Sequence, residues 1–400
     1  MLTAFRYTFV VRFDDPILTK FAAGHHSAGY ERAALALGRL AGMLALAPAP
    51  VLSQFAHRLV DAMVLHTLRS EHHAFTSARY AHWRAGLDTL ALEAPLEARS
   101  PRILAQAVLM ALATSSFAPI AAAARAAQAA LRAIPDGASD DERAATEGIV
   151  AAGRALASSA CARHPSDLVR LAVAAANDLH FAPRERLRTR LELGAFARVI
   201  ERRADPSPVW AIDLALGEAF TDDLGAVRFL PFPGALPLAG LRNDLEPEER
   251  HEVLASAIET AAQALTKLLD ETLVQLRTLE DRLPKLRSTS RAPELAGLLL
   301  AVGPLSSHQI QRVLAASRLG VRDMLGKLAG AKVLRKERIN GTYLYSIALD
   351  FPEKNARGAQ TTPLPFSKAT LDEFDAAIAA ADAVLARSGW DQRDIDDCDA

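Results

Sequence analysis

The sequence has few of the residues that build disulfide frameworks or metal clusters. Its 400 residues include two cysteines, Cys161 and Cys398, too few for a disulfide framework or a multi-cysteine metal site. That scarcity favours the reducing cytoplasm. No apolar run reaches the roughly 20 residues of a membrane span, and no signal-peptide core follows Arg6. We therefore expect a cytoplasmic protein with no membrane partner.

Aromatic residues and catalytic motifs are also scarce. Aromatics make up 6% of the chain, whereas alanine, the residue with the highest helix propensity, is abundant. The Walker phosphate loop is absent, as are Gly-x-Gly-x-x-Gly, His-Glu-x-x-His and Gly-x-Ser-x-Gly. The composition predicts a mainly α protein, and we expect no enzyme activity, no cofactor and no metal.

One polar cluster keeps an enzymatic alternative open. Imidazole and carboxylate groups could bind zinc or transfer protons near neutral pH. The alternative is an ordinary surface or core-satisfied cluster, which we favour. The residues concerned are His66, Glu71, His72, His73 and His82.

Proline, glycine and charge divide the chain into four parts. We predict a helical N-terminal domain over residues 1–208, with a short strand at 4–12. Residues 209–284 read as a loop-rich crossing and a long amphipathic helix, 285–350 as a winged helix, and 351–400 as a linker, a short helix and an acidic tail. The expected fold is a multi-helix N-terminal body with a C-terminal winged helix-turn-helix, in which a short β-hairpin forms the wing.

Apolar periodicity predicts helices at 51–70, 79–92, 101–134, 140–162 and 166–179. After Pro183 we expect an Arg-rich helix that ends before Pro206. This segment either extends a DNA footprint or is a solvated helix, and its interspersed glutamates favour the second.

The longest predicted helix begins at Asp244 and runs to about Leu283. Apolar residues follow one another along it at steps of three and four, which is close to a heptad seam. The stripe predicts a core helix, and the alternative is a dimerisation helix that leads into the winged helix.

The net charge of −1 hides a strong asymmetry. Residues 287–347 hold ten Lys or Arg against three Asp or Glu, a net +7 that leaves −8 for the rest. A basic module in an acidic protein indicates a polyanion partner.

Within this module the pattern predicts three short helices and a hairpin. Helix one spans 294–302, Ser306 or Ser307 caps helix two, and Ser317 caps a third helix that runs to about Gly330. The buried stripe of helix three is expected to be Val321, Met324, Leu325 and Leu328. Asn340-Gly341 between two strand-like runs is a strong signal for a type I′ hairpin.

These elements predict a surface that binds duplex DNA. Arg318 and Arg322, with Leu319, occupy the outer face of the first turns of helix three, the part of a recognition helix that meets base edges. Other side chains suit phosphate contacts, which position the protein without reading sequence. They are Ser306, Ser307, His308, Ser317 and Lys327, with Arg335, Lys336, Arg338 and Asn340 at the wing tip.

Residues 283–347, LPKLRSTSRAPELAGLLLA through KVLRKERINGTYLYSI, resemble a known C-terminal winged helix. It is found after the catalytic domain in the Fic family, and in uncharacterised alphaproteobacterial proteins that are often plasmid-borne. The Fic catalytic motif, His-Pro-Phe with Gly-Asn-Gly-Arg, is absent, so the resemblance does not imply AMP transfer.

The resemblance and the basic module together imply a transcription or plasmid-maintenance regulator that acts as a homodimer. The alternative is an adaptor whose winged helix grips another protein. A third hypothesis is an unfamiliar enzyme that uses the histidine cluster.

Overall fold

The computed structural model of the protein describes eight stretches of the chain. These are residues 27–88, 99–133, 139–183, 188–193, 196–201, 207–242, 244–283 and 290–349. They are mainly helical, as predicted, with a small three-stranded antiparallel sheet near the end. The predicted strand at 4–12, and the linker, helix and tail beyond residue 350, lie outside the described residues.

The first three helices begin the core of the body. They are α1 (Ser27–Leu46), α2 (Ala49–Ser70) and α3 (Ser77–Arg84). Pro50 lies in the first turn of α2, where its missing N–H has no intrahelical role. Along α2, Phe55, Leu59 and Met63 are fully buried, so this helix runs through the centre of the core.

The single helix expected over 101–134 is two helices, and that prediction is wrong. They are α4 (Pro101–Ala113) and α5 (Ala118–Ala130). Pro119 lacks an N–H and disfavours helical backbone at the residue before it, so a continuous helix cannot pass this point. Thr114 ends α4 by donating its hydroxyl to the carbonyl oxygen of Ala111 at 2.7 Å.

Helices α6 (Asp140–Ser159) and α7 (Leu168–Ala176) confirm the two helices predicted next, with shorter ends. Ser139 caps α6 and accepts a hydrogen bond from the Glu142 N–H at 3.1 Å. A 3-10 turn over Pro165–Asp167 leads into α7.

The Arg-rich segment after Pro183 forms a hairpin, so the helix predicted there is wrong. Strands β1 (Arg188–Leu193) and β2 (Phe196–Glu201) pair antiparallel, with Leu193 opposite Phe196. The register leaves two residues, Gly194 and Ala195, to join them. Glycine is unfavourable inside a helix, and aromatic and β-branched residues favour strands, which together outweigh the helix propensity of arginine.

Short turns follow, as the prolines and glycines predict. They are α8 (Trp210–Ala215) and the 3-10 segments η3 (Leu216–Ala219), η4 (Asp222–Phe229) and η5 (Leu238–Leu241). Asp213, buried in α8, accepts hydrogen bonds from the N–H groups of Gly234 and Leu236, both at 2.9 Å. One carboxylate thus holds a loop more than 20 residues away.

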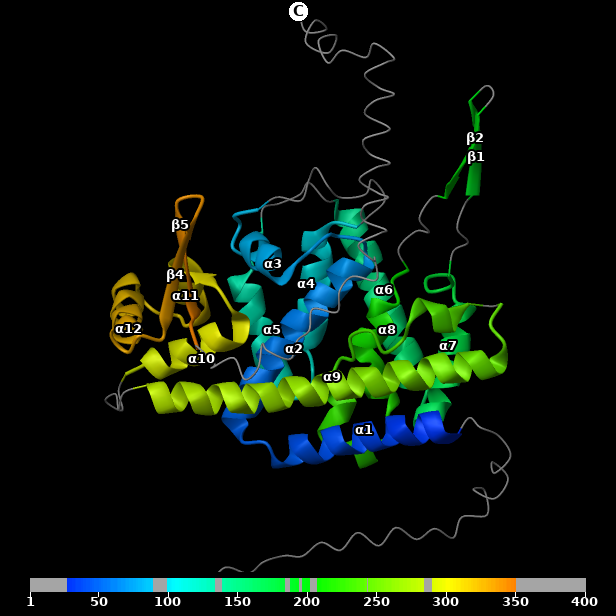
Figure 1. Ribbon diagram of the computed structural model, residues 1–400, viewed down its shortest axis with the longest axis horizontal. Coiled ribbons are helices and arrows are strands. Elements are labelled where there is room, and N and C mark those ends of the chain that lie inside the picture. The colour runs from blue at the N-terminus through cyan, green and yellow to red at the C-terminus, as the bar shows by residue number, and fades with distance from the viewer. Residues whose placement is uncertain are drawn as a thin grey trace, which may run out of the picture. The chain divides into compact units, whose positions relative to one another are not determined.

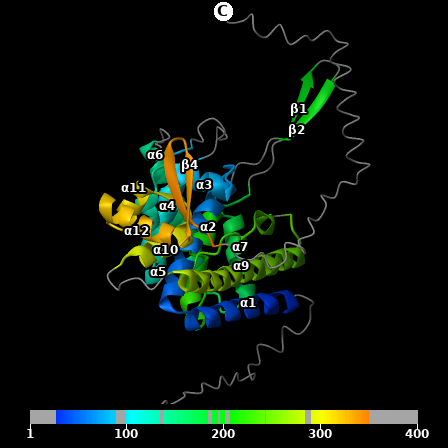
Figure 2. The same ribbon diagram turned by 60° about the vertical axis from the view of Figure 1, so that its left-hand side comes forward.

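The long helix α9 (Pro247–Arg282) lies alongside α1, as Figures 1 and 2 show. Its apolar stripe, which includes Leu254, Ile258 and Leu265, is buried inside the chain itself. The core-helix prediction is therefore confirmed, and this stripe is not available to a second copy of the protein.

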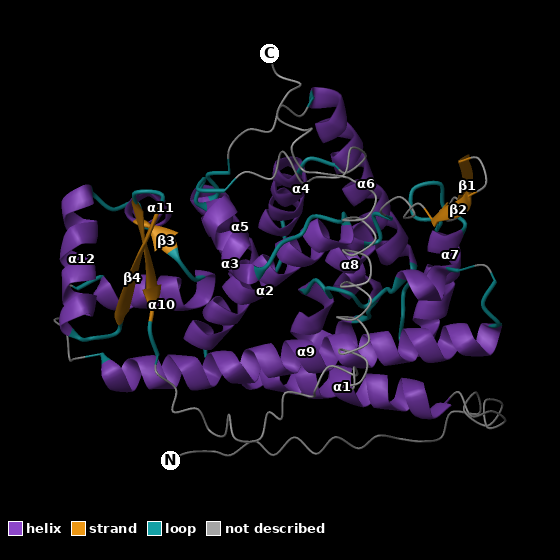
Figure 3. Cartoon of the chain, turned by 45° about the horizontal axis from the view of Figure 1, so that its top comes forward, coloured by secondary structure: helices purple, strands orange, loops and turns teal. Residues whose placement is uncertain are grey.

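The last described elements are three helices and three strands. In order they are α10 (Ala292–Val302), β3 (Leu305–Ser306), α11 (Ser307–Val313), α12 (Arg318–Gly330), β4 (Leu334–Ile339) and β5 (Thr342–Ile347). The strands form an antiparallel sheet in the order β3-β5-β4 (Figure 3). We call residues 290–349 the C-terminal module.

Among the described residues, no helix has both the length and the apolar character needed to cross a membrane.

Candidate nucleic-acid interface

Two serine caps define the helix starts of the C-terminal module. Ser306 caps α11 in a capping box, in which Gln309 Oε1 accepts from the Ser306 N–H at 2.9 Å. Ser317 caps α12 and accepts from the Gly320 N–H at 3.1 Å. Between the two helices, Ala315 adopts a positive φ of 46°, which turns the chain sharply. Both predicted helix starts are confirmed.

The module packs around a second apolar cluster, to which Ala130 of α5 and Leu279 of α9 also belong, and this cluster orients α12. Leu295, Leu299 and Ile310 meet a stripe of α12 that is buried as predicted and consists of Val321, Met324, Leu325 and Leu328. Because the stripe faces inward, the opposite side of α12 faces solvent. The helix α12 packs against α10, α11 and β4.

The exposed side of α12 carries the side chains that we expected there. Arg318 and Arg322 are exposed, and Leu319 is 75% exposed. Neither arginine makes a hydrogen bond or ion pair to another described residue. Two guanidinium groups therefore stand free, one turn apart, at the start of the helix.

The hairpin of β4 and β5 adds a cationic ribbon. Asn340 and Gly341 both have positive φ, 47° and 80°, so the predicted type I′ turn is confirmed. The register places Arg338 opposite Tyr343. The Lys336 ammonium lies 3.7 Å from the centre of the Tyr343 ring, a cation–π contact that holds this charge at the surface.

The remaining predicted residues differ in how freely they are presented. Ser307, His308, Ser317, Arg335 and Asn340 are exposed. Lys327 is also exposed but forms an ion pair with Asp323 at 2.7 Å. Ser306 is only 7% exposed, and its hydroxyl hydrogen-bonds Gln309. Ser306 therefore builds the fold and is not free to contact a phosphate, which corrects that assignment.

This surface also includes the aromatic ring of Tyr343 and two cations, Arg312 and Lys332. None of the three was among the predicted contacts. Arg312 on α11 and Lys332 before β4 are exposed, and Tyr343 is 41% exposed. The two-residue turn fixes the cross-strand register, so Tyr343 opposite Arg338 could have been found from the sequence. No local pattern marks Arg312 or Lys332.

A buried network attaches the module to the helical body. Arg84, only 1% exposed, donates to Asp61 of α2 and to the carbonyl oxygen of Val302 of α10, each at 2.6 Å. Burial acts to lower the pKa of Arg84, but the ion pair with Asp61 raises it overall. Fully buried Gln309 donates to the carbonyl oxygens of Arg84 and Ala130, at 3.2 and 2.7 Å.

The tip of the β4–β5 hairpin also touches the body. The Asn340 amide donates to the carbonyl oxygen of Leu87 at 3.2 Å, just beyond the end of α3. This contact leaves Lys336 and Arg338 exposed.

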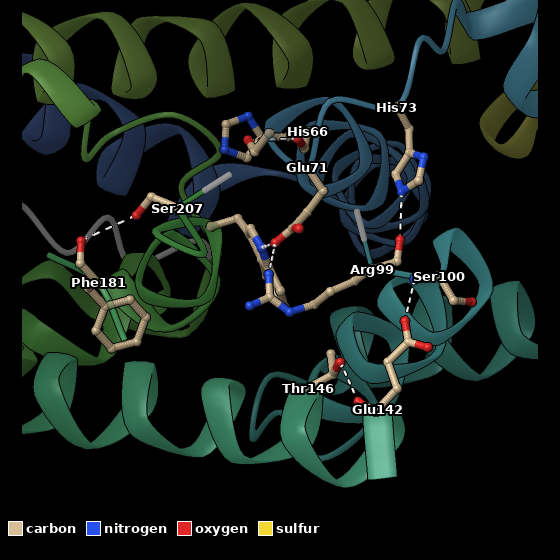
Figure 4. Close-up of polar contacts among 11 residues, drawn as sticks. His66, Glu71, His73, Arg99, Ser100, Glu142, Thr146, Phe181 and Ser207 are labelled. Atoms are coloured by element: carbon tan, nitrogen blue, oxygen red, sulfur yellow. Dashed lines mark hydrogen bonds and ion pairs between the residues drawn. The ribbon is translucent and has the colours of Figure 1, made fainter. Parts of the chain in front are cut away.

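The histidine cluster lies elsewhere and is spread among separate partners (Figure 4). His66 lies 3.1 Å from buried Asp213, whereas His73 meets the carbonyl oxygen of Arg99 at 2.8 Å. Glu71, fully buried, accepts from Arg99 at 2.6 Å and from the Trp210 indole at 2.7 Å. Burial raises the pKa of both Glu71 and Asp213.

Within the described ranges, no three His, Cys, Asp or Glu side chains gather where they could hold a metal ion. The zinc alternative for His66–His82 therefore lacks a ligand set in this part of the chain. The polar groups instead connect α2 to α8 and to the segment before α4.

Neither a known protein-family model nor a curated protein sequence matches this chain. The case for a function therefore depends on the site itself.

Proposed function

We propose that residues 285–350 are a winged helix-turn-helix and that the protein binds duplex DNA with it, as a transcription or plasmid-maintenance regulator. The order of helix, short strand, two helices and hairpin supports this proposal. The observation that carries it is the pair of exposed guanidinium groups of Arg318 and Arg322 at the start of α12, neither of which has a partner among the described residues.

Arginine at this place suits base recognition. The N-terminal part of a recognition helix meets base edges in the major groove, and a guanidinium group can donate twice to guanine. The cations of the hairpin, Arg335, Lys336 and Arg338, suit phosphates or the minor groove beside it. The net +7 of residues 287–347 adds attraction for any duplex.

The first test is binding of a random-sequence duplex at low salt, measured by fluorescence anisotropy with the full-length chain. We expect binding that weakens steeply as salt rises, because phosphate contacts release counterions. No binding at low salt would contradict the proposal and favour the adaptor alternative.

The second test separates base contacts from phosphate contacts after a preferred sequence has been selected from a random pool. Arg318→Ala or Arg322→Ala should weaken that site by about 1–3 kcal/mol and relax sequence preference. Arg335→Ala or Lys336→Ala should weaken all sequences alike and lower the salt slope by about 1.

Arg170→Ala is the matched control, because Arg170 is 71% exposed on α7 and lies outside the module. If all four module variants bind as the control does, the surface is wrongly assigned. The homodimer expected from the sequence stays a prediction, which sedimentation of the full-length chain would test.

A further inference from the structure

We propose that a cleft in the helical body binds a small anionic molecule, one with a carboxylate or phosphate group on a compact apolar frame. The cleft has a volume of about 650 Å³ and lies among the α4–α5 turn, α6 and the segment from α8 to η4. Small-molecule sites typically occupy about 300–1,000 Å³. The proposal does not depend on DNA binding.

The first anion-binding group is Arg154 of α6. Its Nε lies 3.0 Å from Glu218 Oε1, while Ser158 donates to the other oxygen of Glu218 at 3.0 Å. Arg154 and Glu218 thus form an ion pair at the cleft, and Ser158 holds the Glu218 carboxylate from its other side. The Arg154 Nη2 donates to the carbonyl oxygen of Ala111 at 3.5 Å, whereas Nη1 has no partner among the described residues, and the side chain is 41% exposed, so Nη1 can meet a ligand.

The second group is Arg228 of η4. Its guanidinium carbon lies 5.1 Å from the centre of the Phe229 ring, which holds it at the cleft wall. Its carboxylate partner, Asp222, is 83% exposed. Exposed ion pairs contribute little to stability, so a ligand anion can take the place of Asp222 at low cost.

Apolar side chains and hydroxyl groups line the rest of the cleft. Leu112, Phe220 and Leu230 are buried and present apolar surface. Ser115 and Ser116 bring hydroxyl groups from the turn before α5. Carboxylates match the planar donor fork of arginine, which favours an anion over a neutral polar ligand.

The charge balance limits the size of the ligand charge. Two arginines and two carboxylates, Glu218 and Asp222, line the cleft, so its net charge is close to zero. A highly charged ligand would meet Glu218, which stays fixed by Arg154 and Ser158. The site therefore fits a singly or doubly charged small molecule with an apolar face.

The test is a ligand-observed NMR titration of the full-length chain with benzoate, phenyl phosphate and the neutral benzamide. Benzoate and phenyl phosphate distinguish a carboxylate site from a phosphate site. At least one of these anions should bind tenfold or more tightly than benzamide. Arg228→Gln and Arg154→Gln should each weaken anion binding tenfold or more.

Arg170→Gln is the matched control, since Arg170 also pairs with a neighbouring carboxylate but lies outside the cleft. If Arg154→Gln does not fold, Arg228→Gln decides the result, because its ion pair is at the surface. The proposal is overturned if neither anion binds at 10 mM, a concentration about 10 times a typical weak Kd of 1 mM. It is also overturned if benzamide binds as tightly as the anions do. Anion binding to Arg228→Gln that equals binding to Arg170→Gln would overturn it as well.

Discussion

Glu71 is a carboxyl group with no access to solvent. The hydrogen bonds from Arg99 and Trp210 both reach Oε1, and Oε2 has no partner among the described residues. Desolvation of the charged form outweighs the attraction of Arg99, which is why the pKa of Glu71 is raised. The folded protein therefore holds a proton on Glu71 more tightly than the unfolded chain does.

The stability of the folded protein depends on pH through this shift in the pKa of Glu71. A raised folded-state pKa contributes stability that is complete below the ordinary value of 4.5 and is lost as the pH rises through the folded value. Glu71→Gln keeps an oxygen that can accept from Arg99 and Trp210, and it removes the buried charge. The free energy of unfolding of the variant, relative to wild type, should therefore rise between pH 4.5 and 7.

Urea unfolding of both proteins across this pH range measures the difference. Asp140→Asn is the control, because it also turns a carboxylate into an amide but at a side chain that is 94% exposed. If the free energy of unfolding of Glu71→Gln relative to wild type stays constant or falls as the pH rises, the attraction of Arg99 outweighs desolvation of the Glu71 carboxylate.

At the scale of elements, caps and turns were predictable because their signals are local. A serine before an apolar run caps α11 and α12, and Asn340-Gly341 closes the hairpin. Errors arose where one local signal opposed another. Alanine and leucine favour helix through residues 101–134, but Pro119 interrupts it, and Gly194 stands in the Arg-rich segment where a hairpin forms.

The cap of α12 is open to a direct test. Ser317→Ala removes the acceptor for the Gly320 N–H, so we expect a loss of about 1 kcal/mol in the stability of this helix. Hydrogen exchange of α12 amides should quicken by about fivefold to tenfold, since 1.4 kcal/mol corresponds to a factor of ten. Ser307→Ala is the control, because Ser307 is exposed and caps neither helix. Equal exchange in both variants would contradict a capping role for Ser317.

At the scale of the whole molecule, the attachment of the module to the body was not predictable. Gln309 and Arg84 are 225 residues apart in the chain, and Gln309 and Ala130 are 179 apart. Such contacts leave no periodic or compositional trace in the sequence. The exposed cations of α12 and the hairpin were predictable, because helical and strand periodicity place them opposite the buried stripe.

Gln309 carries this attachment through two carbonyl groups of the body, and it also completes the capping box of α11. Gln309→Met has a similar volume but removes the donor to both carbonyl oxygens; that of Arg84 keeps the Arg132 N–H at 2.8 Å, whereas that of Ala130 loses this donor. Burying an unpaired polar group costs about 1–3 kcal/mol, so the variant should unfold at lower urea concentration. Gln311→Met, on the same helix but only half-buried, is the control.

Where Gln309→Met loosens the protein is more informative than how much stability it loses. If Gln309 holds the module on the body, hydrogen exchange in Gln309→Met should increase more in α10 and α11 than in α2, whose Phe55, Leu59 and Met63 are packed without Gln309. An equal increase in all three helices would mean that body and module unfold together as one cooperative unit. No increase at α10 would mean that Arg84, through its bond to Val302, holds the module without help from Gln309.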